Sequence, residues 1–283
     1  MHPSSPHLAA QVPTLTFNNG VEIPQVGFGV FKVPAAETKA AVTSALEVGY
    51  RHIDTAKLYD NEAAVGEAIA EAGIDRDDLF VTTKVWNDDQ GHDATLRAFD
   101  ASLKRLGLDH LDLYLIHWPY PGQDLYVETW KTLEELYADG RVRSIGVSNF
   151  QPTHLQRLLD ETETVPAINQ VELHPWLQQR ELREFHAEHG IVTEAWSPIS
   201  RGARLADPAI AELADKHGTS PAQVILRWHL DIGNVIIPKS VKRDRMAANL
   251  DLFDLRLDAD DHAVIDGLDE GTRIGPNPDE FGA

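Results

Sequence analysis

The chain has 283 residues, 42% apolar and 25% charged, which is enough for one large hydrophobic core or two smaller ones. Its 45 acidic residues exceed its 25 basic ones and give a formal net charge of −20, which opposes binding to nucleic acid and to anionic membrane surfaces. It has no cysteine, which excludes disulfides, thiolate nucleophiles and cysteine metal ligands.

The chain opens with MHPSSPHLAAQVP, a stretch without the basic and apolar regions of a signal peptide. No later segment approaches the roughly 18 consecutive apolar residues of a membrane helix. We therefore expect a flexible tail over 1–13 and a soluble, cytoplasmic protein. The next stretch, TLTFNNGVEIP, alternates polar and apolar residues around Asn19 and Gly20. This pair accepts the positive φ of a tight turn, so the pattern predicts a β-hairpin.

After the hairpin, short β-branched runs alternate with longer stretches of helical periodicity. The expected helices cover 37–48, 61–71, 93–106, 126–138, 152–160, 179–189, 208–217, 221–231 and 242–250. Gly49 is placed to end the first of them, and Ser220 followed by Pro221 is an N-cap with proline at the first helical position.

Eight strand–helix units follow one another without a Pro/Gly/Ser-rich linker between them. This pattern predicts a single α/β domain over 1–283, a (β/α)8 TIM barrel, and argues against two doubly wound domains. We expect the hairpin to cap the bottom of the barrel and residues 268–283 to lie over its active site.

In a (β/α)8 barrel the functional groups lie at the C-terminal ends of the strands. Here the expected strand ends carry polar or aromatic side chains: Asp54, Lys84, His117, Ser148, Asn149, Gln170, Trp196 and Lys239. A lone residue of this kind is usually structural. A series in order around one rim favours a functional site.

Four side-chain types near this rim can together protonate a carbonyl oxygen. A lysine ammonium lowers the pKa of a neighbouring tyrosine, which is otherwise about 10, and a buried aspartate keeps that ammonium charged. A histidine N–H can orient the carbonyl oxygen. Such a site also needs a bound hydride donor.

Several stretches resemble the aldo-keto reductase family. GYRHIDTAKLYDNEAAVG is similar to the first signature of that family, and LDLYLIHWP to the segment with its histidine. GVSNF and NQVELHP resemble its nicotinamide-binding segments, and IPKSV its cofactor-phosphate segment. The likeness runs from IPQVGFGVFKVP to NPDEFG. The form EAWSPIS and the short segment after it look most like the bacterial 2,5-diketo-D-gluconate reductase branch.

The resemblance implies a catalytic tetrad of Asp54, Tyr59, Lys84 and His117. In it Tyr59 is the proton donor, Lys84 its activator and Asp54 the anchor of Lys84, while His117 orients the substrate. The implied cofactor is NADPH or NADP+, bound by Ser148, Asn149, Gln170, Trp196, Ser197, Ile199, Lys239, Ser240, Val241, Arg245 and Asn249. Phe31, Trp86, His117 and Trp118 are the expected substrate-binding residues.

The segment 239–245 supports the phosphate assignment on physical grounds, because it is basic in a strongly acidic chain and follows the eighth strand. Other positions depart from the family pattern. Ala248 stands where a glutamate often pairs with the adenine, and Asp60 and Lys57 replace a common glycine and alanine. Lys57 is a rival for the activating lysine, but its place in a loop predicts a solvated ammonium.

The leading hypothesis is a monomeric NADPH-dependent reductase acting on aldehydes, ketones, dicarbonyls or keto-sugar acids. One alternative is an NADPH-binding sensor or assembly subunit on the same barrel. Another is a metal-dependent hydrolase, which is less favoured because neither His-x-His after the first strand nor HExxH is present. We expect no metal. GFGVFK lacks the third glycine of a Rossmann fingerprint.

Overall fold

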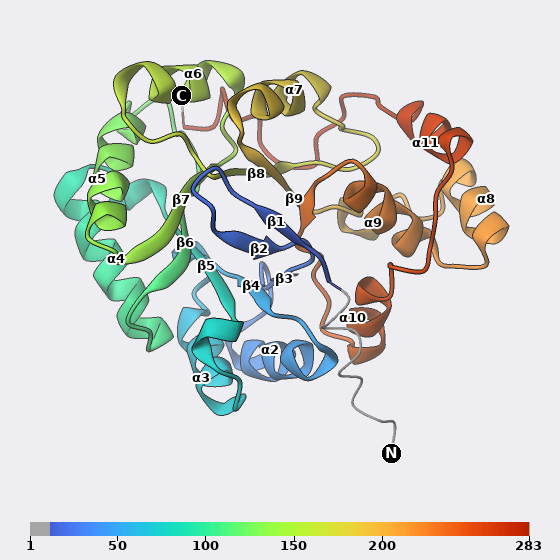
Figure 1. Cartoon of the computed structure of the whole chain (residues 1–283), viewed down its shortest axis with the longest axis horizontal. Helices are drawn as coiled ribbons and strands as arrows, with labels where there is room; N and C mark the ends of the chain where they lie inside the picture. The colour runs from blue at the N-terminus through green and yellow to red at the C-terminus, as the bar shows by residue number, and fades with distance from the viewer. Residues whose placement is uncertain (1–11, 283) are drawn as a thin grey trace.

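Eight parallel strands form the central sheet of the computed structural model, which describes residues 12–282 (Figure 1). They are β3 (Phe28–Gly29), β4 (His52–Asp54), β5 (Phe80–Val85), β6 (Leu111–Ile116), β7 (Val142–Ser148), β8 (Ile168–Glu172), β9 (Val192–Trp196) and β10 (Val235–Ile236). Each strand pairs with the next one along the chain. A parallel bridge between Val26 and Ile236 joins the first strand to the last, with Gly27 N–H donating to Ile236 O over 2.8 Å. The predicted closed barrel is confirmed.

Helices surround the barrel on its outer side (Figure 1). They are α2 (Ala35–Val48), α3 (Glu62–Glu71), α4 (His92–Leu106), α5 (Tyr126–Ala138), α6 (Pro152–Glu161), α7 (Arg180–His189), α8 (Pro208–His217), α9 (Pro221–Asp231), α10 (Arg243–Leu250) and α11 (Ala259–Asp266). The expected helices are all present, with ends that agree to within two residues. Only α11 was not expected, because its few apolar residues give almost no helical periodicity.

Two expected helix ends have the local chemistry that the sequence indicated. Gly49 ends α2 with a φ of 128°, a conformation that favours glycine. At the start of α9, the Ser220 side chain accepts a hydrogen bond from Gln223 N–H, and the Gln223 side chain accepts one from Ser220 N–H. This reciprocal pair satisfies two of the backbone donors that a helix start leaves free.

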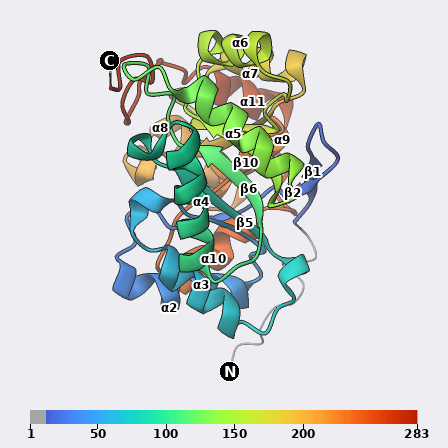
Figure 2. The same ribbon diagram turned by 90° about the vertical axis from the view of Figure 1, so that its left-hand side faces the viewer.

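The hairpin of β1 (Thr14–Thr16) and β2 (Glu22–Pro24) covers the N-terminal end of the barrel, as expected. Gly20 supplies the positive φ of its turn, 86°. Phe17 and Ile23 are buried in a cluster with Phe80 and Ile168, which begin β5 and β8. Figure 2 shows the hairpin and the C-terminus on opposite sides of the molecule. The hairpin therefore does not cover the C-terminal ends of the strands, where the site is expected.

The expected tail over 1–13 lies almost wholly outside the described residues, which begin at 12. Among the helices of residues 12–282, none is both long enough and apolar enough to cross a membrane.

Candidate active site

A cavity of about 580 Å³, here called the rim cavity, opens at the C-terminal ends of the strands. Most of the residues expected at the site line it: Phe31, Asp54, Tyr59, Trp86, His117, Trp118, Ser148, Asn149, Gln170, Trp196, Ser197, Ile199, Lys239 and Arg245. Lys84 is fully buried and contacts Asp54 and Tyr59 from beneath. Ser240 and Val241 lie within the basic segment 239–245 and Asn249 lies after it, and none of the three lines the cavity. Sequence reasoning missed Lys32, Arg201, Pro276 and Phe281, which also line it.

Asp54, Lys84 and Tyr59 form a connected group at one side of the rim cavity. Lys84 Nζ donates to Asp54 Oδ1 and Oδ2 over 2.7 and 2.8 Å and to Thr55 O over 2.9 Å. Its distance to the Tyr59 hydroxyl is 3.4 Å. The carboxylate and the carbonyl satisfy the buried ammonium, which would otherwise be costly to bury. The hydroxyl of Tyr59 thus lies next to a fixed positive charge.

The loop that holds Tyr59 is fixed by its own hydrogen bonds. Tyr59 ends a short 3-10 helix, η1 (Lys57–Tyr59), and its N–H donates to Ala56 O over 3.0 Å. The side chain of Asn61 accepts from the Thr55 hydroxyl over 2.8 Å and donates to Val30 O over 3.1 Å. These contacts tie the loop after β4 to the loop after β3.

The two lysines near Tyr59 have different partners. Lys57 pairs with Asp89 and remains about one-third exposed, whereas Lys84 is completely buried. Lys57 is not part of the lining of the rim cavity. The structure thus brings Lys84 to the tyrosine from 25 residues further along the chain, at strand β5.

Burial dominates the electrostatics of this group. It raises the pKa of Tyr59 to about 12, although the Lys84 ammonium lowers it. We expected the lysine to bring this pKa towards neutrality, but in the closed pocket burial has the larger effect. Burial also opposes the charge of Lys84, but Asp54 and Tyr59 outweigh it and raise the pKa of Lys84. At neutral pH Tyr59 therefore keeps its proton and Lys84 its charge.

His117, at the end of β6, presents a neutral ring to the same cavity. Burial, assisted by the Lys84 charge, holds its pKa well below the usual value. Its ring centroid is 5.7 Å from that of Tyr59 and 5.1 Å from that of Trp86, in edge-to-face arrangements. A neutral imidazole has one N–H donor and no net charge. It can orient a carbonyl oxygen without competing for the proton of Tyr59.

Ser148, Asn149 and Gln170 form a linked polar wall opposite Tyr59. The Ser148 hydroxyl donates to Gln170 O over 2.8 Å, and the Asn149 amide donates to His117 O over 2.9 Å. Asn149 has a φ of 64°, and its side-chain oxygen accepts from Trp196 Nε1 over 2.8 Å. Gln170 Nε2 donates to Asp54 over 2.9 Å and to Glu194 over 2.8 Å. Both of its N–H groups are used, so Gln170 Oε1 is left to accept from a ligand.

Glu194 is a buried carboxyl group that sequence reasoning missed. It lies within β9, is 0% exposed, and contacts Gln170 beneath the rim cavity. Burial, together with the Asp54 charge, raises its pKa to about 8. An acidic residue inside an otherwise uncharged strand, VTEAW, was the signal that could have identified it.

The raised pKa of Glu194 has a consequence for stability. Between about pH 4.5 and 8 the folded carboxyl holds a proton that the unfolded chain has released, so its contribution to stability falls as pH rises through this window. We expect Glu194→Gln to remove this loss, because glutamine does not titrate. Its free energy of unfolding, relative to the wild type, should increase by up to about 4 kcal/mol between pH 4.5 and 8.5.

Urea unfolding of both proteins at pH 4.5, 6.5 and 8.5 measures this difference. The groups that face Glu194 are Asp54, His52 and Lys84, and all three are the same in the two proteins. A stability difference that stays constant across this range would contradict the assignment.

Aromatic side chains and the C-terminal segment narrow the mouth of the cavity. Phe281 packs on Trp118, with ring centroids 4.6 Å apart, and on Trp86, at 6.5 Å. The carboxylate of Glu172 holds the segment by accepting from the backbone N–H groups of Ile274 and Gly275 over 2.6 and 2.8 Å. Phe281 thus packs on Trp86 and Trp118, two of the expected substrate-binding residues.

Basic side chains also line the cavity. Lys32 extends from the loop after β3, Arg201 from the loop after β9, and Lys239 and Arg245 from the segment after β10. Arg201 and Arg245 have no hydrogen-bond or ion-pair acceptor within residues 12–282, and Arg201 has a φ of 54°. Guanidinium groups without a protein acceptor are available to a phosphate. Within the same residues, no cluster of three His, Asp or Glu side chains could hold a metal ion.

This barrel, with a buried lysine–aspartate pair beside a tyrosine and a histidine, defines a class of oxidoreductase. Residues 25–270 match the model of the aldo/keto reductase family. The glyoxal reductase of Bacillus subtilis (strain 168) is 53% identical over 95% of this chain and 97% of its own. The methylglyoxal reductase DkgA of Escherichia coli (strain K12) is 50% identical over 96% of this chain and 99% of its own length. The chain belongs to the aldo/keto reductase family, and the resemblance found in the sequence is confirmed.

Solved structures of relatives have the same fold. A mutant of Gox0644 in complex with NADPH is 49% identical, covers 95% of this chain and 98% of its own, and superposes with a TM-score of 0.92. The aldo-keto reductase of Bombyx mori in complex with NADP is 40% identical. The match covers 95% of this chain and 96% of the Bombyx mori chain, with a TM-score of 0.89.

Proposed function

We propose that this protein reduces the carbonyl group of small aldehydes, ketones, dicarbonyls such as methylglyoxal, and keto-sugar acids, with NADPH as the reductant. The arrangement of Asp54, Lys84 and Tyr59 is the main support for the proposal. A fully buried ammonium 3.4 Å from a phenol favours transfer of the phenol proton to a substrate. Relatives named glyoxal reductase and methylglyoxal reductase support small dicarbonyls as the first substrates to test.

In the proposed mechanism, NADPH supplies the hydride that reaches the carbonyl carbon. The carbonyl oxygen lies between Tyr59 and His117, and the imidazole N–H holds it in place. As negative charge develops on this oxygen, the Tyr59 hydroxyl gives it a proton. The Lys84 ammonium stabilises the resulting phenolate, and Asp54 keeps the ammonium charged and in position. The product is an alcohol, and solvent restores the proton of Tyr59.

The residues in and near the rim cavity support NADPH as the cofactor. Gln170 Oε1 and the Ser148–Asn149 pair would hold the nicotinamide carboxamide, with Trp196 beside the ring. Ser197 and Ile199 continue this wall towards the phosphate end, where Lys239 and Arg245 would bind the ribose 2′-phosphate. Ser240, Val241 and Asn249 would contact the outer phosphate and adenine from the segment beyond the cavity.

Replacement of Arg245 tests the phosphate assignment. We expect Arg245→Met to raise the KM for NADPH by about 10- to 100-fold, because a charged hydrogen-bonding pair with the 2′-phosphate is lost. The KM for NADH, which has no 2′-phosphate, should change by less than about twofold. Steady-state kinetics with both cofactors measures this. Equal increases for NADPH and NADH would contradict the role of Arg245.

The experiment that tests the proposed function is an assay of NADPH oxidation at 340 nm with a panel of carbonyls. The panel contains methylglyoxal, glyoxal, an aromatic aldehyde and a keto-sugar acid. We expect turnover that depends on the carbonyl, with kcat/KM highest for a small dicarbonyl. Tight NADPH binding without turnover of any carbonyl would favour the sensor alternative instead.

A further inference from the structure

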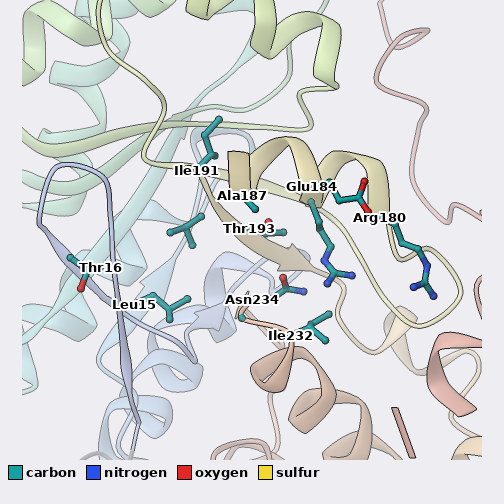
Figure 3. Close-up of a pocket in the computed structure, with 12 residues that line it drawn as sticks. Leu15, Thr16, Arg180, Glu184, Ala187, Ile191, Thr193, Ile232 and Asn234 are labelled. Carbon is teal, nitrogen blue, oxygen red and sulfur yellow. The ribbon is translucent and has the colours of Figure 1, made fainter. Parts of the chain in front are cut away.

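A second cavity of about 530 Å³, here called the lower cavity, lies at the N-terminal end of the barrel (Figure 3). Its lining residues come from β1, α7, the start of β9 and the link from α9 to β10. Figure 3 shows Leu15, Ile191 and Ile232 around it, with Arg180 and Glu184 extending from α7. Its volume falls in the range of roughly 300–1,000 Å³ that is typical of small-molecule sites.

Arg183 is the exceptional residue of this lining. Twelve of the 16 arginines, all of which lie within residues 12–282, donate to a carboxylate, a carbonyl or a side-chain amide. The exceptions are Arg97, Arg183, Arg201 and Arg245. Arg97 is exposed to solvent, and Arg201 and Arg245 line the rim cavity, where we place phosphate groups. Arg183 is partly buried and lines the lower cavity. By the same reasoning, it is available to an anion there.

The charge of Arg183 is affected by groups of both signs. Burial lowers its pKa, and the nearby Arg180 charge lowers it further, whereas the Asp266, Glu184 and Asp269 carboxylates raise it. A guanidinium group has five N–H donors in a planar fork, and a carboxylate can accept two of them side by side. Such a ligand would supply the acceptors that the described residues do not provide. It would also relieve the repulsion between the two arginines.

The neighbouring carboxylates limit the charge of this ligand. Arg180 Nε lies 3.5 Å from Asp269, and another of its nitrogens lies 3.8 Å from Asp266, so its charge is already partly balanced. Glu184 also lines the lower cavity. A dianion such as a phosphate ester would be repelled by these three acidic groups. A ligand with a single negative charge is repelled less than a dianion, and Arg183 is the lining arginine that has no acceptor among residues 12–282.

The rest of the lining is largely apolar and therefore favours a ligand whose remaining part is apolar. Leu15, Ile191, Val192 and Ile232 contribute apolar surface, and Thr16, Thr193 and Asn234 are the uncharged polar side chains. The Thr193 hydroxyl is already bonded to His186 over 2.8 Å, and the Asn234 amide to His229 over 3.1 Å. We propose that the lower cavity is a binding site for a monocarboxylic acid with an apolar body, whose carboxylate pairs with Arg183.

Hexanoate is a suitable probe, and isoleucine methyl NMR of the NADPH-saturated protein can locate it. Ile191 and Ile232 line the lower cavity, whereas Ile199 and Ile237 line the rim cavity. We expect saturable shifts of the Ile191 and Ile232 methyl signals, and smaller or no shifts with neutral hexanol or dianionic hexyl phosphate. Arg183→Met should raise the dissociation constant of hexanoate at least about tenfold. Arg183→Lys, which keeps the charge but loses the fork, should have an intermediate effect.

Arg97→Met is the matched control, since it removes another arginine without an acceptor from an exposed position. It should leave hexanoate binding unchanged. Unperturbed Ile199 and Ile237 signals in the Arg183 variants would show that the fold is intact. The proposal fails if hexanoate shifts only Ile199 and Ile237, or if Arg183→Met binds it as tightly as the wild type. It also fails if hexanol binds equally well.

Discussion

Tyr59→Phe is expected to lower kcat/KM for methylglyoxal by about 100- to 10,000-fold, the usual contribution of a general acid. The substitution removes only the hydroxyl group that lies 3.4 Å from Lys84 Nζ. The aromatic ring, which packs on Phe31 with centroids 5.1 Å apart, is kept. Because burial holds the pKa of Tyr59 at about 12, the wild-type phenol is protonated throughout the neutral range. The variant therefore loses the proton donor without losing the shape of the site.

The binding of NADPH separates this effect from a loss of structure. We expect the dissociation constant of NADPH, measured by fluorescence titration, to change by less than about twofold in Tyr59→Phe. Tyr137→Phe is the matched control, since its hydroxyl only accepts a 3.4 Å hydrogen bond from Asn19 at the far end of the barrel. It should keep wild-type kinetics. Turnover of Tyr59→Phe at the wild-type rate would assign the proton donor to another group.

The barrel and most of its rim were predictable from sequence because both depend on short-range patterns. Strand and helix periodicities alternate along the chain, and the closed fold then places every strand end on one rim. Asp54, Lys84 and His117 could be found in this way, since each lies at or next to the end of a buried strand. The position of α11 could not, because its short sequence, ADDHAVID, has few apolar residues and almost no helical periodicity.

Residues that reach the rim from loops were harder to predict. Arg201 enters the rim cavity from a loop in which it has a positive φ, a conformation that its residue type does not suggest. Phe281 arrives from the C-terminal segment, whose path depends on Glu172 holding Ile274 and Gly275. Such placements follow from three-dimensional contacts between distant segments. No local sequence pattern specifies them.

Glu194 shows a different limit of sequence reasoning. Its strand was predicted, and the alternation of that strand directs it into the barrel interior, but its chemistry depends on a partner from the neighbouring strand. Gln170 uses one amide hydrogen for Glu194 and the other for Asp54. This shared amide links a protonated carboxyl group to the ionised pair beneath Tyr59. The link appears only when β8 and β9 are in register.

Lys84→Met is expected to damage both stability and catalysis. It leaves the Asp54 carboxylate buried without the ammonium that contacts both of its oxygens, and removal of one partner from a buried ion pair costs about 3–5 kcal/mol. It also removes the charge that stabilises the Tyr59 phenolate. We expect kcat/KM for methylglyoxal to fall at least about 100-fold. Urea unfolding and steady-state kinetics measure the two effects.

Lys57→Met is the control that distinguishes Lys84 from Lys57, the other lysine near Tyr59. Lys57 is about one-third exposed and pairs with Asp89 at the surface of the loop, so its loss should cost at most about 1 kcal/mol. Its kinetics should stay within about twofold of the wild type. If Lys57→Met abolished reduction while a folded Lys84→Met retained it, the activating charge would come from the loop and the assignment of Lys84 would be wrong. The burial of Lys84 against Asp54 supports the opposite result, since only a fixed and desolvated ammonium acts strongly on the phenol.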